Sequence, residues 1–75
     1  MGRYFYDVYD RGRRVRDDLG MSHDTVAAAI NEASMVIDNL ADEARFDPTP
    51  GLILVSLRDE RGHCLYEASA SLASD

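Results

Sequence analysis

The sequence is poor in the features that small proteins use to stabilise or anchor themselves. Its 75 residues include one cysteine, Cys64, so the chain cannot form the disulfide framework of a small secreted domain. The longest apolar run, residues 26–30, is far shorter than the roughly 18 residues of a membrane-spanning helix. The N-terminus has no apolar segment of the kind found in secretory signals. We therefore expect a single cytoplasmic domain over residues 1–75.

Lysine is also absent, and all eight basic residues are arginines. Five of them lie in the first sixteen residues, where only Asp7 and Asp10 oppose them, so this segment carries a charge of +3. From Asp17 onward, twelve acidic residues outnumber three arginines and leave −9, which gives a net charge of −6. This asymmetry favours either an anionic partner for the basic end or contact between the opposite ends of two copies.

The hydrophobic pattern predicts four strands and one helix in the order β-β-α-β-β. Apolar residues spaced by three and four from Val26 to Ala44 are typical of an amphipathic helix. Ile53, Val55 and Leu57 alternate with other side chains, as in a strand with one buried face. We expect strands over residues 3–10, 14–16, 52–58 and 63–72 and a helix over residues 22–46. This order predicts an α+β fold, with two hairpins in one mainly antiparallel sheet and the helix on one face.

The start of the helix is open between three candidate N-cap residues. Ser22, Asp24 and Thr25 each carry a side-chain oxygen that can accept a hydrogen bond from an amide of the first turn. If Ser22 is the cap, Met21 and Val26 occupy the positions of a hydrophobic staple. If Thr25 is the cap, the helix begins three residues later.

One helix covers a single face of a four-stranded sheet, and the other face is predicted to retain apolar side chains. Aromatic residues fall on both faces of the first strand, and Met35 lies nearly opposite the apolar stripe of the helix. A domain of this size buries only about 60% of the surface that its unfolded chain exposes, so a second copy would add stability. We expect a non-enzymatic interaction module that forms a homodimer through the open sheet face or a strand edge, with a second protein as a further candidate partner. The candidate interaction residues are Tyr4, Tyr6, Met35 and Leu54.

The alternative function is the binding of single-stranded RNA or DNA by the N-terminal hairpin. Tyr4, Phe5, Tyr6 and Tyr9 lie near several arginines, and such side chains stack on bases and bind phosphates. The net charge of −6 opposes this function, because phosphate affinity is largely electrostatic. The candidate anion-binding residues are Arg11, Arg13, Arg14 and Arg16.

The sequence contains no recognisable catalytic or cofactor-binding motif, so we expect neither an enzyme nor a cofactor. His23, His63 and Cys64 lack the paired short spacings of a structural zinc site. His63 and Cys64 are adjacent in a strand and are expected to face opposite sides, which argues against a catalytic dyad. Cys64 is expected to be a small buried hydrophobic residue. Asp38 and Asp42 are expected on the solvated face of the helix, which argues against a catalytic pair of carboxylates.

Three sequence motifs carry a resemblance to a known family. The opening Arg3-Tyr4-Phe5-Tyr6-Asp7-Val8 is followed by Asp17-Asp18-x-Gly20 and later by Arg58-Asp59-Glu60-x-Gly62. Together they resemble small proteobacterial proteins, common in rhizobia and their relatives, that are classified only as a domain of unknown function. The resemblance covers nearly the whole chain and implies one cytoplasmic bacterial domain, without any activity, cofactor or site residue. The chain differs at Tyr6, where a second Phe is usual, and at Ile30, where a polar residue is more typical.

Overall fold

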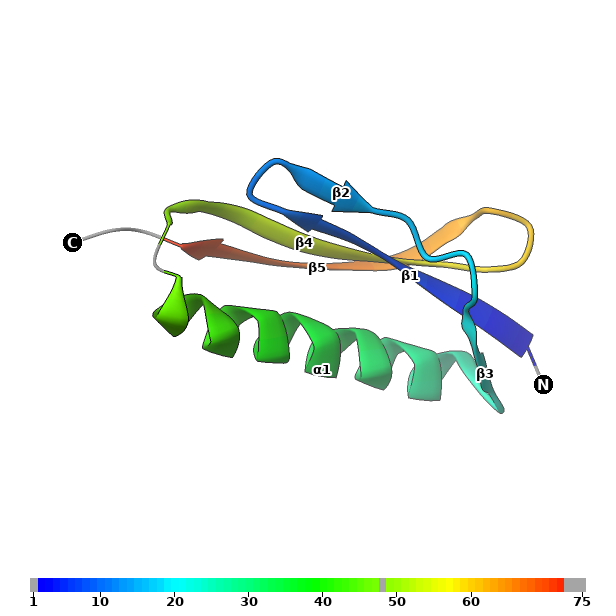
Figure 1. Ribbon diagram of the computed structural model, residues 1–75. Coiled ribbons are helices and arrows are strands. Elements are labelled where there is room, and N and C mark those ends of the chain that lie inside the picture. The colour runs from blue at the N-terminus through cyan, green and yellow to red at the C-terminus, as the bar shows by residue number, and fades with distance from the viewer. Residues whose placement is uncertain (1, 48, 73–75) are drawn as a thin grey trace.

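The computed structural model describes residues 2–47 and 49–72, which form an antiparallel sheet with one helix along one face (Figure 1). The strands pair in the order β2-β1-β4-β5, and β3 pairs with the start of β1. The predicted α+β fold, with one hairpin before the helix and one after it, is therefore confirmed. The elements are β1 (Gly2–Asp10), β2 (Arg13–Val15), β3 (Met21–His23), α1 (Val26–Glu43), the 3-10 helix η1 (Ala44–Phe46), β4 (Gly51–Arg58) and β5 (Cys64–Leu72).

The core lies between α1 and the sheet. On β4, every second side chain faces the helix, and these three residues are fully buried, as their alternation predicted. Ala29 and Ala33 of α1 are also fully buried, and their small side chains let the helix backbone approach the sheet closely. The buried cluster consists of Tyr4, Ala29, Ala33, Ile37, Ile53, Val55 and Leu57.

The helix begins later than residue 22. Thr25 is the N-cap residue, because its Oγ1 accepts a hydrogen bond from the amide of Ala28 at 3.1 Å. The preceding residues Met21–His23 form β3, which pairs with Gly2–Tyr4 of β1. The prediction missed β3 because three residues are too few to show a strand period. Val26, in the first turn, is 44% exposed, so the buried stripe starts one turn after the point that the sequence suggested.

The last strand contains a bulge near its start. Leu57 pairs with Tyr66 whereas Arg58 pairs with Cys64, so Leu65 is an extra residue in β5. The bulge removes Cys64 from the helix-facing row to which simple alternation assigned it. Cys64 is exposed, and the prediction that it is buried is wrong. Beyond the bulge, the predicted row packs against the core and comprises Tyr66, Ala68, Ala70 and Leu72.

Candidate functional sites on the open face and the free edge of the sheet

The sheet face away from α1 carries a row of mixed apolar and polar side chains. In β1, Phe5, Asp7 and Tyr9 alternate with the helix-facing residues, and each has a partner of the same orientation in β4. Tyr9 lies opposite Leu54, and Phe5 lies opposite Arg58. No element among the described residues packs over the centre of this face, which is open in Figure 1.

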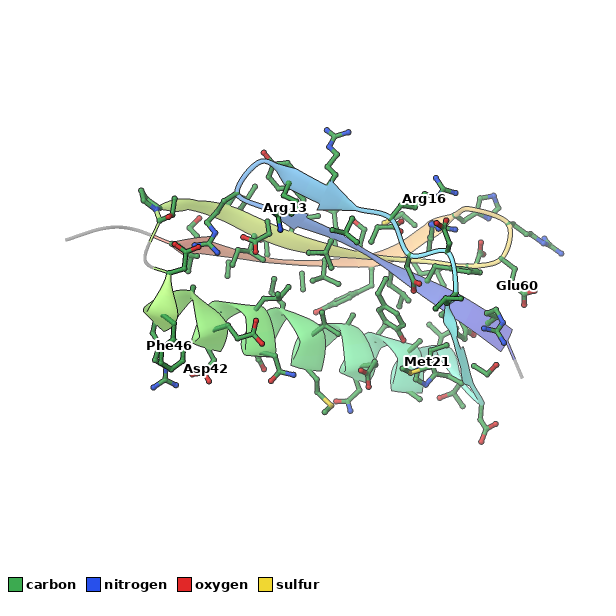
Figure 2. All side chains as sticks on the ribbon, in the orientation of Figure 1. Arg13, Arg16, Met21, Asp42, Phe46 and Glu60 are labelled. Atoms are coloured by element: carbon green, nitrogen blue, oxygen red, sulfur yellow. The ribbon has the colours of Figure 1, made fainter. Side chains whose placement is uncertain are left out.

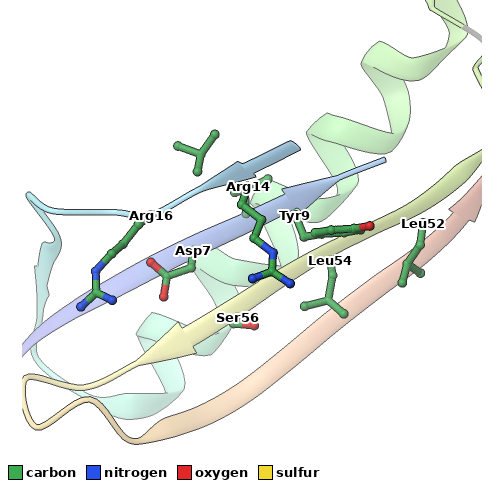
Figure 3. Close-up of a pocket in the computed structure, with 9 residues that line it drawn as sticks. Asp7, Tyr9, Arg14, Arg16, Leu52, Leu54 and Ser56 are labelled. Atoms are coloured by element: carbon green, nitrogen blue, oxygen red, sulfur yellow. The ribbon is translucent and has the colours of Figure 1, made fainter. Parts of the chain in front are cut away.

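A shallow groove of about 610 Å³ lies over β2, β1 and β4 on this face (Figure 3). Tyr9 and Leu54 form its floor, and Leu52, a residue that is 41% exposed, continues the apolar surface. Arg14 and Arg16 come from the β2 side and extend beside the floor, as Figure 3 shows. The complete lining is Asp7, Val8, Tyr9, Arg14, Val15, Arg16, Leu52, Leu54 and Ser56.

The two groove arginines are weakly engaged. The guanidinium carbon of Arg14 lies 6.0 Å from the centre of the Tyr9 ring, which is the outer limit of a cation–π contact. Arg16 lies 3.8 Å from Asp18, but their side chains are 73% and 85% exposed. Such exposed ion pairs are strongly screened by solvent. Both guanidinium groups therefore remain accessible to a ligand in the groove.

Asp7, by contrast, is held in a polar network at one end of the groove. Its Oδ2 accepts a hydrogen bond from Nε of Arg58 at 2.8 Å, and its Oδ1 accepts one from the amide of Asp17 at 2.9 Å. Arg58 also donates to the carbonyl oxygen of Asp17 at 2.8 Å and lies over the Phe5 ring at 4.5 Å. These bonds join β1, β4 and the loop that follows β2.

The side chain of Asp17 organises that loop. Its Oδ1 accepts hydrogen bonds from the amides of Leu19 at 3.1 Å and Gly20 at 3.0 Å, and its Oδ2 accepts one from the amide of Tyr6 at 3.0 Å. Burial favours the neutral acid, but the bonds from Gly20, Tyr6 and Leu19, with the charge of Arg58, outweigh it and lower the pKa of Asp17. Asp17 is therefore a structural carboxylate.

The motifs that carry the family resemblance meet at this network. Nη1 of Arg3 donates to the carbonyl oxygen of Leu19 at 2.6 Å, and its amide donates to Oε1 of Glu60 at 3.2 Å. Gly20 has a φ of +72° and lies against Phe5, so a side chain here would be both strained and crowded. The sequence did not predict that these residues form a network. The sequence signal that could have indicated the network is that residues 5 and 7 on β1 and residue 58 on β4 face the same side of the sheet.

The four predicted anion-binding arginines do not form one site. Arg11 is occupied: Nε donates to Oδ1 of Asp10 at 2.6 Å, and Nη1 donates to the carbonyl oxygens of Asp47 and Thr49. Its hydrogen bond with Asp10, opposed by burial, raises its pKa. Arg13, which Figure 2 labels, is exposed and lines a different hollow beside Asp10, Arg11 and Asp47. Only Arg14 and Arg16 share the groove.

The four predicted interaction residues are also separated. Tyr4 is buried beneath the helix, and Tyr6 packs against the same core, so neither belongs to the open face. Leu54 lies in the groove, whereas Met35 is 51% exposed on α1, which covers the other face of the sheet. Tyr4 and Tyr6 therefore face the helix and not the open side of the sheet. The sequence did not predict this, because the alternation of side chains in β1 does not show which side the helix covers.

A tyrosine–histidine pair lies between the sheet and α1. The hydroxyl of Tyr6 lies 2.7 Å from Nε2 of His23 and donates to the carbonyl oxygen of Ala29 at 3.2 Å. Burial, together with the nearby charges of Glu32 and Asp17 and the neighbouring Tyr4, raises the pKa of Tyr6 to about 12. The pair closes the junction of β1, β3 and α1.

The two edges of the sheet differ in whether their outer backbone groups are paired. Along the outer side of β1, β3 pairs with residues 2–4 and β2 pairs with residues 8–10. Between them, Asp17 accepts the amide hydrogen of Tyr6. On the other edge, β5 pairs with β4 on its inner side, and nothing within residues 2–47 and 49–72 pairs with its outer side. We name the outer side of Cys64–Leu72 the free edge.

Among the described residues, no three His, Cys, Asp or Glu side chains lie close enough to hold a metal ion. The described helices include none that is long and apolar enough to cross a membrane.

No curated protein and no solved structure matches the chain. The family model described as Domain of unknown function (DUF6894) matches residues 3–71, a range that contains all three motifs around Asp7, Asp17 and Arg58. The chain therefore belongs to the DUF6894 family.

Proposed function

We propose that the chain is a small non-enzymatic interaction module that forms a homodimer by antiparallel pairing of β5 with β5 of a second copy. The observation that carries this proposal is the contrast between the two edges. The β2 edge is three residues long and carries Arg13 and Arg14, and charge on an edge discourages pairing. The free edge extends over nine residues without proline, lysine or arginine. Its amides and carbonyls are available for a second strand.

The length of β5 indicates the register of this pair. Full overlap of two copies of Cys64–Leu72 places the two-fold axis at Ala68. Ser69 then lies opposite Glu67 of the second copy, where its hydroxyl can donate a hydrogen bond to the carboxylate. An axis at Glu67 would set two carboxylates directly opposite one another, and such pairs are unfavourable.

The helices support the same arrangement. Because α1 packs on both β4 and β5, edge pairing would bring the two copies of α1 about two strand spacings apart, or ~10 Å. Helices pack at this separation. The pKa of Tyr6 is raised first by burial and then by the charge of Glu32, so Glu32 lies near Tyr6. Because Tyr6 belongs to β1, Glu32 lies on the flank of α1 that faces β1. At 100° per residue, the opposite flank carries the half-buried, uncharged Ile30, Ser34 and Ala41. These side chains would meet across the dimer.

A catalytic role has less support. Asp7, Asp17 and Arg58, which form the polar network at the end of the groove, are bonded to one another and to backbone groups. This use fits a structural function. The exposed thiol of Cys64, the one cysteine in the chain, fits a reducing compartment, and we propose a cytoplasmic location.

The experiment is a mass measurement by light scattering over a series of protein concentrations. We expect a mass approaching twice 8.4 kDa as the concentration rises. Ser69→Glu should weaken dimerisation about tenfold, since it sets two new carboxylate pairs against Glu67 of each partner. Ser69→Lys should not weaken it, because the new charge is opposite to that of Glu67.

The matched control is Ser22→Glu, which adds the same charge to an exposed serine of β3 on the other edge. It should leave the dimerisation constant unchanged. A mass that stays at 8.4 kDa at the highest concentration contradicts the proposal. Equal weakening by Ser69→Glu and Ser22→Glu would also contradict it, because that result would assign the effect to net charge.

A further inference from the structure

The groove on the open face has features of its own, apart from the free edge. We propose that it binds an acidic peptide segment that also carries large apolar side chains. Tyr9, Leu54 and Leu52 supply an apolar floor, and Arg14 and Arg16 supply positive charge beside it (Figure 3). This site lies over β2, β1 and β4, whereas the proposed dimer contact lies on β5. The two proposals therefore stand or fall separately.

The charge of the groove is the first argument for an acidic partner. Asp7 is the only acidic residue in the groove lining, and its carboxylate is bound by Nε of Arg58 at 2.8 Å. It therefore does not neutralise Arg14 or Arg16. Arg14 contacts no carboxylate in the described part of the chain, and the Arg16–Asp18 pair is mostly exposed. A positive groove on a chain of net charge −6 selects partners by electrostatic complementarity.

The placement of the aromatic residues favours a peptide over a nucleic acid. Single-stranded nucleic acids are bound on platforms where several aromatic rings stack on successive bases. Here Tyr4 and Tyr6 lie on the helix side of the sheet. The Phe5 ring is covered by the guanidinium group of Arg58 at 4.5 Å. Tyr9 is the one ring in the groove, which is too few for a stacking platform.

The floor of the groove fits alternating side chains. Leu52 and Leu54 are two positions apart on β4, and Tyr9 lies opposite Leu54 on β1. An extended peptide places every second side chain on the same face, so its apolar residues can contact this floor. Acidic residues further along the same face of the segment then come within reach of Arg14 and Arg16. Apolar contact and charge pairing are therefore satisfied by one extended segment.

The test measures fluorescence anisotropy of a labelled synthetic peptide in which every second residue is Ser and the positions between them carry Leu and Phe followed by Asp and Glu. A peptide with Lys in place of each acid and a single-stranded oligouridine are the comparison probes. We expect the full chain to bind the acidic peptide at least about tenfold more tightly than either comparison probe. The affinity should fall as salt is added, because the arginines are exposed.

Variants then assign the site. Arg14→Glu should weaken binding of the acidic peptide by about tenfold or more. Arg13→Glu is the matched control, because it makes the same charge change at the neighbouring position but lies outside the groove lining. It should change the affinity by less than about threefold. Leu52→Ser, at an exposed position of the floor, should also weaken binding, with circular dichroism used to check the fold. Ser69→Glu should leave peptide binding intact.

Three results would overturn this proposal. The first is no saturable binding of the acidic peptide, or a preference for the lysine peptide. The second is equal weakening by Arg13→Glu and Arg14→Glu, which would indicate a general charge effect. The third is tighter binding of oligouridine with the same dependence on Arg14, which would assign the groove to nucleic acid.

Discussion

Arg58 and Asp7 are joined on the open face of the sheet, although they lie 51 positions apart in the sequence: Nε of Arg58 donates to Oδ2 of Asp7 at 2.8 Å. The amide of Asp17 donates to the other oxygen of Asp7, and its carbonyl oxygen accepts from Arg58. The Asp7 carboxylate and the Arg58 guanidinium group thus connect β1, β4 and the loop that follows β2.

Removal of Asp7 should destabilise the fold. Asp7→Ala leaves the Arg58 guanidinium, which is mostly buried, without its carboxylate and leaves the Asp17 amide without its acceptor. We expect a loss of about 2 kcal/mol in the free energy of unfolding. Thermal denaturation should then show a midpoint lower by about 10 °C. Asp18→Ala is the control, because its ion pair with Arg16 is exposed, and it should change stability by less than about 0.5 kcal/mol.

Asp17 should contribute to the acid sensitivity of the fold. Its pKa is lowered in the folded chain, because hydrogen bonds from Gly20, Tyr6 and Leu19 outweigh the effect of burial. On acidification the unfolded chain therefore binds this proton first, from about pH 4. The stabilisation is present above that pH and is lost as the pH falls through the folded pKa.

Urea denaturation at a series of pH values measures this contribution. Asp17→Asn should lower stability at neutral pH. The side-chain amide has one acceptor oxygen and one donor NH₂ group, so it cannot accept the three backbone hydrogen bonds that the two carboxylate oxygens accept. It should also flatten the fall in stability below about pH 4 relative to the unmodified chain. The neighbouring Asp18→Asn should leave the slope unchanged. A slope that is the same in all three proteins would show that Asp17 does not have a lowered pKa.

The sequence allowed the order of the elements and the core face of β4 to be predicted. The alternation of Ile53, Val55 and Leu57 has a single interpretation, because the intervening positions include Ser56 and Arg58. The helix stripe from Val26 to Ala44 was equally clear, although Val26 itself is exposed. Both signals are periodic patterns over many residues, and burial of one face enforces them.

The open face was harder to predict because β1 is apolar on both sides. Tyr4 and Tyr6 alternate with Phe5 and Tyr9, so either row was a candidate for the core. The pairing of β1 with β4 shows which row faces the core, because Tyr6 lies opposite the buried Leu57. Register depends on contacts distant in sequence, and no local period reports it.

The loop after β2 was unpredictable for a related reason. The backbone amide of Tyr6 donates a hydrogen bond to the carboxylate of Asp17, eleven positions away in the sequence. Such a bond depends on where the chain turns back. The bulge at Leu65 is a similar case, because one extra residue reversed the orientation expected for Cys64. Local irregularities of this kind leave no periodic signal.

Gly20 should tolerate a side chain less well than Gly12. Both have positive φ values, +72° and +98°, at which other residues are strained. A Cβ on Gly20 would also lie 2.8 Å from Cε1 of Phe5 and 2.9 Å from the carbonyl oxygen of Tyr4, whereas one on Gly12 meets nothing within 4 Å. We expect Gly20→Ala to cost about 3 kcal/mol and Gly12→Ala about 1 kcal/mol in urea denaturation. Equal costs would mean that the Phe5 contact is easily relieved.

Tyr6 should stabilise the junction of β1 and α1 through its hydroxyl. That hydroxyl donates to the carbonyl oxygen of Ala29 at 3.2 Å and lies 2.7 Å from Nε2 of His23. Tyr6→Phe removes both contacts and keeps the ring, so it should lower the free energy of unfolding by about 1 kcal/mol. Tyr9→Phe is the matched control, because the Tyr9 ring lies on the open face.

The same hydroxyl should make stability depend on alkaline pH. The pKa of Tyr6 is raised to about 12, first by burial and then by the charges of Glu32 and Asp17. The unfolded chain releases this proton from about pH 10, so the stabilisation is complete below that pH and is lost as the pH rises towards the folded pKa. Urea denaturation between about pH 9 and 11 should therefore show a steeper decline for the unmodified chain than for Tyr6→Phe. Parallel declines would indicate that the hydroxyl of Tyr6 ionises in the folded chain as readily as in the unfolded one.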